Sequence, residues 1–390
     1  MIDYDSIMSS SVHALKPSGI RKFFDILENM HDESAISLGI GEPDFVTPWH
    51  IREAGIYSLE QGFTKYTGNA GMKKLREEIS RYLMRRFSLK YDPNGQIFVT
   101  VGGSEAIDLC IRTVVEPGDE VIIPVPSFVC YGPLVSLSRG VPVFVQTKEE
   151  NEFRLTADEL RAAITPRTKL VVFPFPNNPT GAVMEREDLE KIAEVLKGTN
   201  IMLLSDEIYS ELSYGIHHTS PANLPELCDR TFVVNGFSKA YAMTGWRLGY
   251  VCGPRELLGQ MLKIHQYGIM SAPTTSQYAA IEAMKAGDED IEMMRESYNN
   301  RRKLMLKRLN EIGLKCFEPK GAFYMFPSIR STGLSSVEFS TRLLKEEKVA
   351  VIPGSAFGDG GEGFVRMCYA SSVENIVEAL DRMERFLKRL

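Results

Sequence analysis

The sequence is poor in the residues that mark disulfide-rich and metal-binding proteins. Only six cysteines occur in 390 residues, none in a CxxC pair, and scattered thiols in mostly apolar segments are typical of reduced, buried side chains. The six histidines are equally dispersed, and the one close pair, His217 and His218, lacks the i, i+4 spacing that places two ligands on one helix face. The sequence therefore predicts reduced thiols and no metal site.

A basic excess and a long apolar run are also missing. The formal charge is −6 and the pI is near 5.7, so nucleic acid is not an expected partner. No apolar run approaches the roughly 20 residues of a membrane span. The first residues, MIDYDSIMSSSVHALKPSG, are acidic and polar where a secretory signal is basic and then apolar. We expect a cytoplasmic protein that does not enter a membrane.

The overall composition is that of an ordinary globular protein. Hydrophobic residues make up 44% of the chain and charged residues 25%, which argues against disorder and coiled coil. A chain of 390 residues exceeds the usual size of one compact core. We therefore expect a large domain with a smaller companion.

Seven short apolar runs alternate with segments of helical length through the middle of the chain. Continuous apolarity is typical of strands that are covered on both faces. Thr156 and Glu159 have the spacing of a capping box at the start of one intervening helix. The alternation predicts an α/β fold with a mostly parallel, doubly wound sheet. The predicted strands span residues 97–101, 120–125, 141–146, 169–175, 201–205, 231–235 and 246–252.

The pattern changes after about residue 285. A long charged helix over 290–313 ends at Gly313, and Ser335 with Glu338 has capping-box spacing. These features predict a separate α+β domain. We expect the helix SGIRKFFDIL (18–27) and the segment ISLGIGEPDF (36–45) to dock on it. The predicted boundaries are a large domain over 48–287 and a small, discontinuous domain made of an N-terminal arm over 1–47 together with 288–390.

Four of the predicted strands end in polar or glycine-rich turns. In an open parallel sheet, ligands bind beyond the carboxyl ends of the strands. Taken alone, each turn has a simpler interpretation: a tight turn, a rigid turn, a helix N-cap or a solvated lysine. The first turn could also hold a phosphate, because glycines allow close approach and a helix N-terminus favours anions. The four turns span 102–105, 176–181, 206–209 and 236–239.

Taken together, the motifs identify a resemblance that covers essentially the whole chain. The sequence resembles class I/II aminotransferases of the pyridoxal-phosphate fold-type I superfamily, and most closely the branch of aromatic and N-acetyl-diaminopimelate aminotransferases. The resemblance implies a large domain with a mostly parallel seven-stranded sheet between helices, and a smaller α+β domain. The motifs, in family order, are SLGIGEPDF, YTGNAGMKKLREEI, VGGSEAIDL, PNNPTGAV, SDEIYSEL, NGFSKAYAMTGWRLGY, KGAFYMFP and VIPGSAFGDGGEGFVRMCYA.

The resemblance implies roles around the ring of pyridoxal 5'-phosphate (PLP). Lys239 would form the Schiff base with the cofactor aldehyde, and Asp206 would pair with the pyridine nitrogen and keep it protonated. Asn178 and Tyr209 would donate hydrogen bonds to the phenolic oxygen. Phe128 would stack on the ring; some relatives carry tryptophan or tyrosine there, but phenylalanine can still stack.

The resemblance also implies how the phosphate is held. Ser238 and Arg247 would bind it, and Tyr66 would reach the phosphate of the neighbouring subunit's cofactor. A homodimer with active sites at its interface follows from that role of Tyr66. The remaining contacts would come from the backbone of Gly103, Ser104 and Glu105.

The substrate site is implied in the same way. Arg366 would bind the α-carboxylate, helped by Gly41 and Asn178, because its planar fork matches a carboxylate. Ser104 stands where some aspartate-using relatives carry lysine. The residues that would select the substrate side chain stay undetermined.

The predicted function is amino-group transfer between an L-amino acid and 2-oxoglutarate by a ping-pong mechanism. The donor could be of the aromatic, aspartate or acyl-diaminopimelate type. One alternative is a carbon-sulfur β-lyase that uses the same pocket. A PLP-sensing transcription regulator is less expected, since the family match begins within the first few tens of residues. By the resemblance, the segment 10–24 closes over the substrate.

Overall fold

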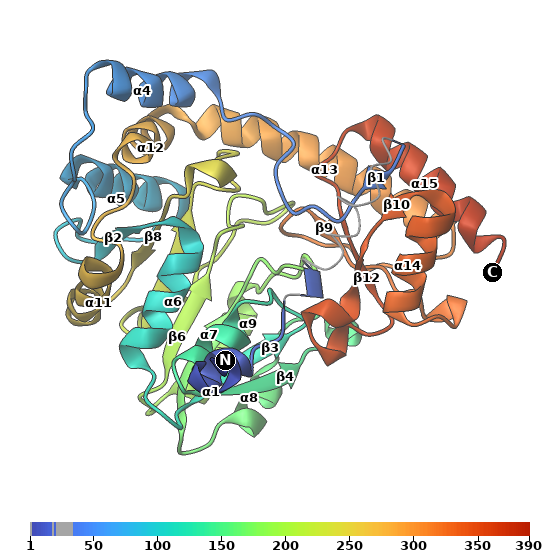
Figure 1. Cartoon of the computed structure of the whole chain (residues 1–390), viewed down its shortest axis with the longest axis horizontal. Coiled ribbons are helices and arrows are strands. Elements are labelled where there is room, and N and C mark those ends of the chain that lie inside the picture. The colour runs from blue at the N-terminus through green and yellow to red at the C-terminus, as the bar shows by residue number, and fades with distance from the viewer. Residues whose placement is uncertain (1, 18, 21–33) are drawn as a thin grey trace.

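The computed structural model describes residues 2–17, 19–20 and 34–390, and its centre is a seven-stranded sheet (Figure 1). Each predicted strand corresponds to one strand of this sheet. The bounds differ from the prediction by a few residues at most. The strands are β2 (Ile97–Thr100), β3 (Glu120–Val125), β4 (Val141–Gln146), β5 (Thr168–Phe173), β6 (Met202–Asp206), β7 (Thr231–Gly236) and β8 (Gly249–Cys252).

The strand order is β2-β8-β7-β6-β5-β3-β4, and β8 alone runs antiparallel to its neighbours, β2 and β7. The predicted α/β class with a mostly parallel sheet is therefore confirmed. The prediction that the last strand begins at residue 246 was wrong. Thr244–Trp246 forms a 3-10 turn and Arg247 has φ 51°, a left-handed conformation that interrupts an extended strand before Gly249.

Helices cover both faces of the sheet. Leu203 and Leu204 are adjacent on β6 and both fully buried, but their side chains belong to different cores, as the alternation along a strand requires. The Leu204 core packs against α6 (Gly102–Val114), α7 (Tyr131–Leu137) and α11 (Arg255–Gly268). The opposite face packs against α5 (Lys73–Phe87), α8 (Ala157–Ala163), α9 (Arg186–Leu196) and α12 (Thr274–Ala286).

The C-terminal part forms a second α+β layer beside the large sheet. The long helix α13 (Asp288–Glu311) is followed by Gly313 at φ 87°, as the predicted helix end requires. Ser335 Oγ accepts a hydrogen bond from the Glu338 N–H, one half of the predicted capping box. The other elements of this layer are β9 (Tyr324–Met325), α14 (Ser336–Glu347), β10 (Val349–Ala350), β11 (Ile352–Pro353), β12 (Val365–Cys368) and α15 (Val373–Leu387).

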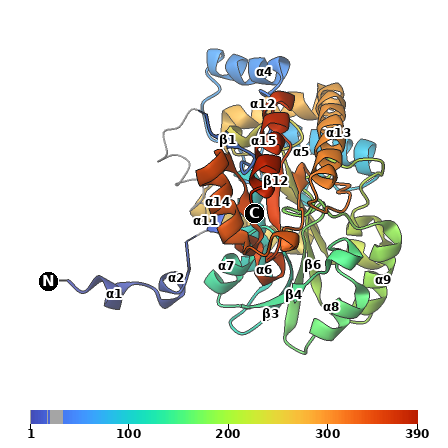
Figure 2. The ribbon, with the colours of Figure 1, turned by 90° about the vertical axis from the view of Figure 1, so that its right-hand side faces the viewer.

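The segment that precedes the large sheet is tied to this second layer. β1 (Ile36–Ser37) pairs in parallel with β10, and Arg301 of α13 donates to both carboxylate oxygens of Asp44 at 2.8 and 2.7 Å. The short helices α1 (Tyr4–Ile7) and α2 (Ser10–His13) project from the body (Figure 2). The predicted helix over 18–27 lies outside the described residues except for 19 and 20, and the domain boundaries stay a prediction.

The sequence predicted that the chain does not enter a membrane and that its cysteines are reduced. Among the residues that the structure describes, no helix combines the length and apolarity needed to cross a membrane. All six cysteines are free thiols, three of them buried and three partly buried. A cytoplasmic location stays a prediction.

Candidate functional site

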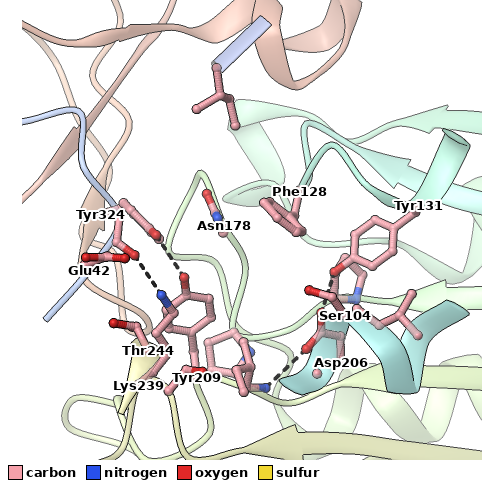
Figure 3. Close-up of a pocket in the computed structure, with 18 of the residues that line it drawn as sticks. Glu42, Ser104, Phe128, Tyr131, Asn178, Asp206, Tyr209, Lys239, Thr244 and Tyr324 are labelled. Atoms are coloured by element: carbon pink, nitrogen blue, oxygen red, sulfur yellow. Dashed lines mark hydrogen bonds between the residues drawn. The ribbon is translucent and has the colours of Figure 1, made fainter. Parts of the chain in front are cut away.

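A cavity of about 660 Å³ lies beyond the carboxyl ends of β5, β6 and β7, beside the start of α6 (Figure 3). The polar turns after these strands meet there, as expected for a parallel sheet. The second layer closes the cavity with Tyr324 and Arg366. The predicted site residues that line it are Gly41, Gly103, Ser104, Phe128, Asn178, Asp206, Tyr209, Ser238, Lys239, Arg247 and Arg366.

Lys239 follows β7 and directs its amine into this cavity. Its Nζ donates a hydrogen bond to the carbonyl oxygen of Gly41 at 2.7 Å and lies 5.9 Å from the centre of the Tyr209 ring. Burial lowers the pKa of Lys239 from 10.5 to about 8, because the charged form loses hydration in the pocket. A substantial fraction of neutral, nucleophilic amine is therefore present at mildly basic pH.

Asp206 ends β6 and is almost fully buried on the cavity floor. Its Oδ2 accepts a hydrogen bond from the Tyr131 hydroxyl at 2.7 Å, and its Oδ1 accepts one from the Ile208 N–H at 3.3 Å. Burial raises the pKa of the Asp206 carboxyl, while these two hydrogen bonds act in the opposite direction. A cationic partner in the cavity would favour the carboxylate further. Sequence reasoning missed Tyr131; its place three residues after Phe128, at the start of α7, was the available signal.

Two buried tyrosines form a second polar group in the cavity. The hydroxyl oxygens of Tyr209 and Tyr324 are 2.8 Å apart. Burial raises the pKa of both phenols well above the usual range, so both are neutral hydrogen-bond donors. Tyr324 was not predicted as a site residue, although it lies in the motif KGAFYMFP. Only its packing against Tyr209, from the turn after β6, brings it to the cavity.

The turn between β2 and α6 has the shape of an anion cradle. Gly102 has φ 75°, and a Cβ on Gly249 would lie 2.6 Å from the backbone of Gly102 and Gly103, so these chains approach as closely as glycines allow. The Arg247 guanidinium lies against Gly102, and Ser238 is buried nearby. The first turn of α6 leaves backbone N–H groups without helical partners. Together these groups favour a phosphate.

Arg366 is a buried cation on the far side of the cavity. It is 2% exposed, and its Nη1 and Nη2 donate to Asn178 Oδ1 at 2.9 Å and to the Gly39 carbonyl at 2.6 Å. Its Nε is buried without a partner, and within the described part of the chain no carboxylate forms an ion pair with it. Its guanidinium lies 4.5 Å from the centre of the Tyr324 ring. A buried arginine that has no ion-pair partner favours an anionic ligand.

Two predicted residues do not line the cavity. Tyr66 lies in the loop between α4 (Trp49–Glu60) and α5 and is 83% exposed. The Glu105 side chain bends back to accept a hydrogen bond from the Val101 N–H, and Glu105 is not part of the cavity lining. In the described ranges, no group of three or more His, Cys, Asp or Glu residues could hold a metal ion.

The comparisons with known proteins agree with this geometry. The family model described as "Aminotransferase class I and II" matches residues 33–383. An aspartate aminotransferase of Pyrococcus abyssi is 47% identical over 386 residues, covering 98% of each chain. A probable N-acetyl-LL-diaminopimelate aminotransferase of Bacillus subtilis is 43% identical, covering 98% of this chain and 96% of the relative. The crystal structure of an aromatic aminotransferase from Pyrococcus horikoshii OT3 superposes with a TM-score of 0.89 at 46% identity, covering 94% and 99%.

The fold and the cavity are those of a fold type I, PLP-dependent enzyme. More narrowly, the chain belongs to the class I and II aminotransferases, and its cofactor is PLP. The residues present fit this cofactor. The glycine-lined cradle would suit its phosphate, a buried carboxylate such as that of Asp206 would suit a protonated ring nitrogen, and the buried amine of Lys239 would suit an aldehyde.

The lowered pKa of Lys239 predicts a pH profile for its reactivity. In cofactor-free protein, acylation of Lys239 by a limiting reagent should be half-maximal at pH about 8, because only the neutral amine reacts. Mass spectrometry of peptides, with the exposed Lys197 as the reference, gives the profile. A midpoint near 10.5, the value of an unburied lysine, would show that burial does not control this amine.

Proposed function

We propose that the enzyme transfers an amino group from an L-amino acid to 2-oxoglutarate through PLP bound as a Schiff base to Lys239. The donor is of the aromatic, aspartate or acyl-diaminopimelate type, and the two half-reactions follow a ping-pong mechanism. When bound, PLP supplies an electron sink for a carbanion at the substrate Cα. The other chemical tasks fall to side chains of this pocket.

Lys239 has two tasks in this proposal. It holds the cofactor covalently at rest, and its freed amine then moves a proton to and from the substrate Cα as general base and acid. The hydrogen bond from Nζ to the Gly41 carbonyl shows that the free amine has a resting place inside the cavity. A pKa of about 8 suits both proton removal and proton return near neutral pH.

The surrounding polar groups tune the ring. Asp206, held by Tyr131, would hold the pyridine nitrogen and stabilise its protonated form. Tyr209 remains a neutral donor because burial raises its pKa, so it can stabilise a phenolate oxygen together with Asn178. Tyr324 orients Tyr209 through the contact between their hydroxyls.

The buried, unpaired guanidinium of Arg366 is the observation that carries the substrate proposal. Two of its nitrogens are fixed by Asn178 and Gly39, so its plane is set before the substrate arrives. A fixed plane lowers the entropic cost of binding a carboxylate. Arg366 would hold the α-carboxylate in the cavity that Lys239 also lines, so that the Lys239 amine could reach the proton on the substrate Cα.

The side chain of the amino-acid donor is not fixed by the residues that line the cavity. The described lining of the cavity offers three cations, Lys239, Arg247 and Arg366, and each already has a cofactor or α-carboxylate role. The relatives act, by their names, on aspartate, aromatic and acetyl-diaminopimelate substrates, which differ in side-chain charge. A panel of these donors with 2-oxoglutarate decides among them.

The exposed apolar residues support the proposed homodimer. Helix α4 lies at one edge of the molecule (Figure 1) and carries four apolar residues that are each 45–58% exposed: Trp49, Ile56, Tyr57 and Leu59. Several exposed apolar side chains on one helix are typical of an interface. Tyr66 lies just beyond α4, where a second chain would bring it toward the partner's cavity.

Replacing Arg366 by lysine should raise KM for the amino-acid donor by about 10- to 100-fold, because a lysine cannot reproduce the planar two-point contact. The change in kcat should be smaller. Steady-state kinetics with saturating 2-oxoglutarate measures both values. An unchanged KM for every active donor would place the α-carboxylate elsewhere.

Replacing Lys239 by alanine should lower transamination by at least about 10²–10⁴-fold, the usual contribution of a general base. Formation of glutamate from 2-oxoglutarate measures it. The same assay separates the β-lyase alternative. The wild-type enzyme should release no pyruvate and ammonia from cystathionine in the absence of an oxo-acid acceptor, and such release would favour the lyase.

Tyr66→Phe should weaken retention of PLP, because the hydroxyl can no longer reach the phosphate in the neighbouring subunit. Hybrid dimers give the control, in which one subunit carries Tyr66→Phe and the other carries Lys239→Ala. The site of the Tyr66→Phe subunit keeps its Lys239 and receives the intact Tyr66 of the Lys239→Ala subunit. PLP retention at this site should therefore return to the wild-type level. Equal retention in Tyr66→Phe homodimers and in hybrids would contradict the shared site, as would full activity of a monomer.

A further inference from the structure

A buried histidine on α11 contacts the helix that begins at the phosphate cradle. The His265 side chain is fully buried, and its Nδ1 lies 2.6 Å from Oε1 of Glu105 on α6. Its ring stands edge-on to Phe98, with ring centres 4.8 Å apart and planes at 85°. Among the described residues, its Nε2 is buried and has no hydrogen-bond partner.

The direction of this hydrogen bond follows from the chemistry of Glu105. A carboxylate can only accept hydrogen bonds, so the ring must donate from Nδ1, and this assigns the proton to that nitrogen. The other carboxylate oxygen, Oε2, accepts from the Val101 N–H at 2.5 Å. Glu105 therefore spans two groups, one on α11 and one at the start of the turn.

The position of Glu105 has a consequence for the cradle. Its backbone belongs to the first turn of α6, but its side chain bends back to Val101. The same turn is held by Thr100 Oγ1, which donates to the Gly102 carbonyl at 2.9 Å, and by the close approach of Gly249. A Glu105 side chain released from His265 could turn toward the cradle, where its negative charge would repel a phosphate.

We infer that His265 is a positioning residue for the phosphate site. By donating from Nδ1 to Glu105, it keeps the carboxylate folded back on Val101, so that the cradle presents backbone N–H groups and no negative charge. The inference rests on the proposed role of the Ser104 and Glu105 backbone in binding the PLP phosphate. His265 itself does not line the cavity.

A merely structural role for His265, packing α11 against α6, predicts different behaviour. Loose packing would weaken binding of any ligand in the cavity. Loss of positioning would weaken only ligands that carry a phosphate. The two roles are separated by the ratio of the dissociation constants of pyridoxal and PLP, because pyridoxal has the same ring and aldehyde without the phosphate.

The experiment titrates cofactor-free full-length protein with PLP and with pyridoxal, followed by intrinsic fluorescence. His265→Phe should weaken the binding of PLP but not that of pyridoxal, so the Kd of pyridoxal divided by the Kd of PLP should fall by about tenfold. This is the order expected when a hydrogen bond to a charged group is lost. His265→Asn, whose amide nitrogen can take the place of Nδ1, should restore the ratio to within about threefold of wild type. His218→Phe removes another buried histidine–glutamate pair, with Glu207, and should leave the ratio unchanged.

A double-mutant cycle keeps the inference testable if His265→Phe binds poorly for other reasons. Glu105→Ala removes the group through which His265 acts. In the Glu105→Ala background, a further change to His265→Asn or His265→Phe should therefore leave the ratio of the pyridoxal and PLP dissociation constants unaltered. If His265→Phe leaves the ratio unchanged, including the case in which the binding of PLP and of pyridoxal is weakened equally, the inference is overturned. Absence of PLP binding by the wild-type protein would instead overturn the proposed function.

Discussion

The chemistry of the pocket depends on the burial of one amine, that of Lys239. Lys239 lies where β7 ends, among aromatic side chains and beside the Gly41 carbonyl, and this setting lowers its pKa to about 8. A lysine kept on the surface would remain charged and unreactive near neutral pH. The parallel strands bring Asp206 and Asn178 to the same edge of the sheet. The chemistry of the site therefore depends on how this one side chain is desolvated.

The second constraint is electrostatic. Arg366 is buried without an acidic partner among the described residues, which is costly for a cation unless a ligand supplies the negative charge. Arg247 at the cradle is exposed and donates to the carbonyl of Thr244. The cavity therefore holds two separated cationic centres, one suited to a phosphate and one to a carboxylate.

Much of this arrangement could be predicted from the sequence, for identifiable reasons. Continuous apolar runs mark the strands of the central sheet, although the edge strand β4 is partly exposed and β8 is antiparallel, and the polar turns that follow those runs contain Asp206 and Lys239. The start of β8 was missed because an apolar pattern carries no sign of the left-handed Arg247. The contacts of Tyr131, Tyr324 and His265 were missed because they join elements that only tertiary packing brings together. The burial of Arg366 was also not evident, since arginines are mostly exposed.

The most direct test of the account is to find the lysine that holds the cofactor. The protein is incubated with PLP and reduced with borohydride, which converts a C=N bond to a stable secondary amine, and its peptides are mapped by mass spectrometry. The account predicts one PLP adduct, on Lys239, and its loss in Lys239→Ala. A transaminating enzyme that carries its adduct on another lysine, or carries none, would contradict the assignment on which the proposed function rests.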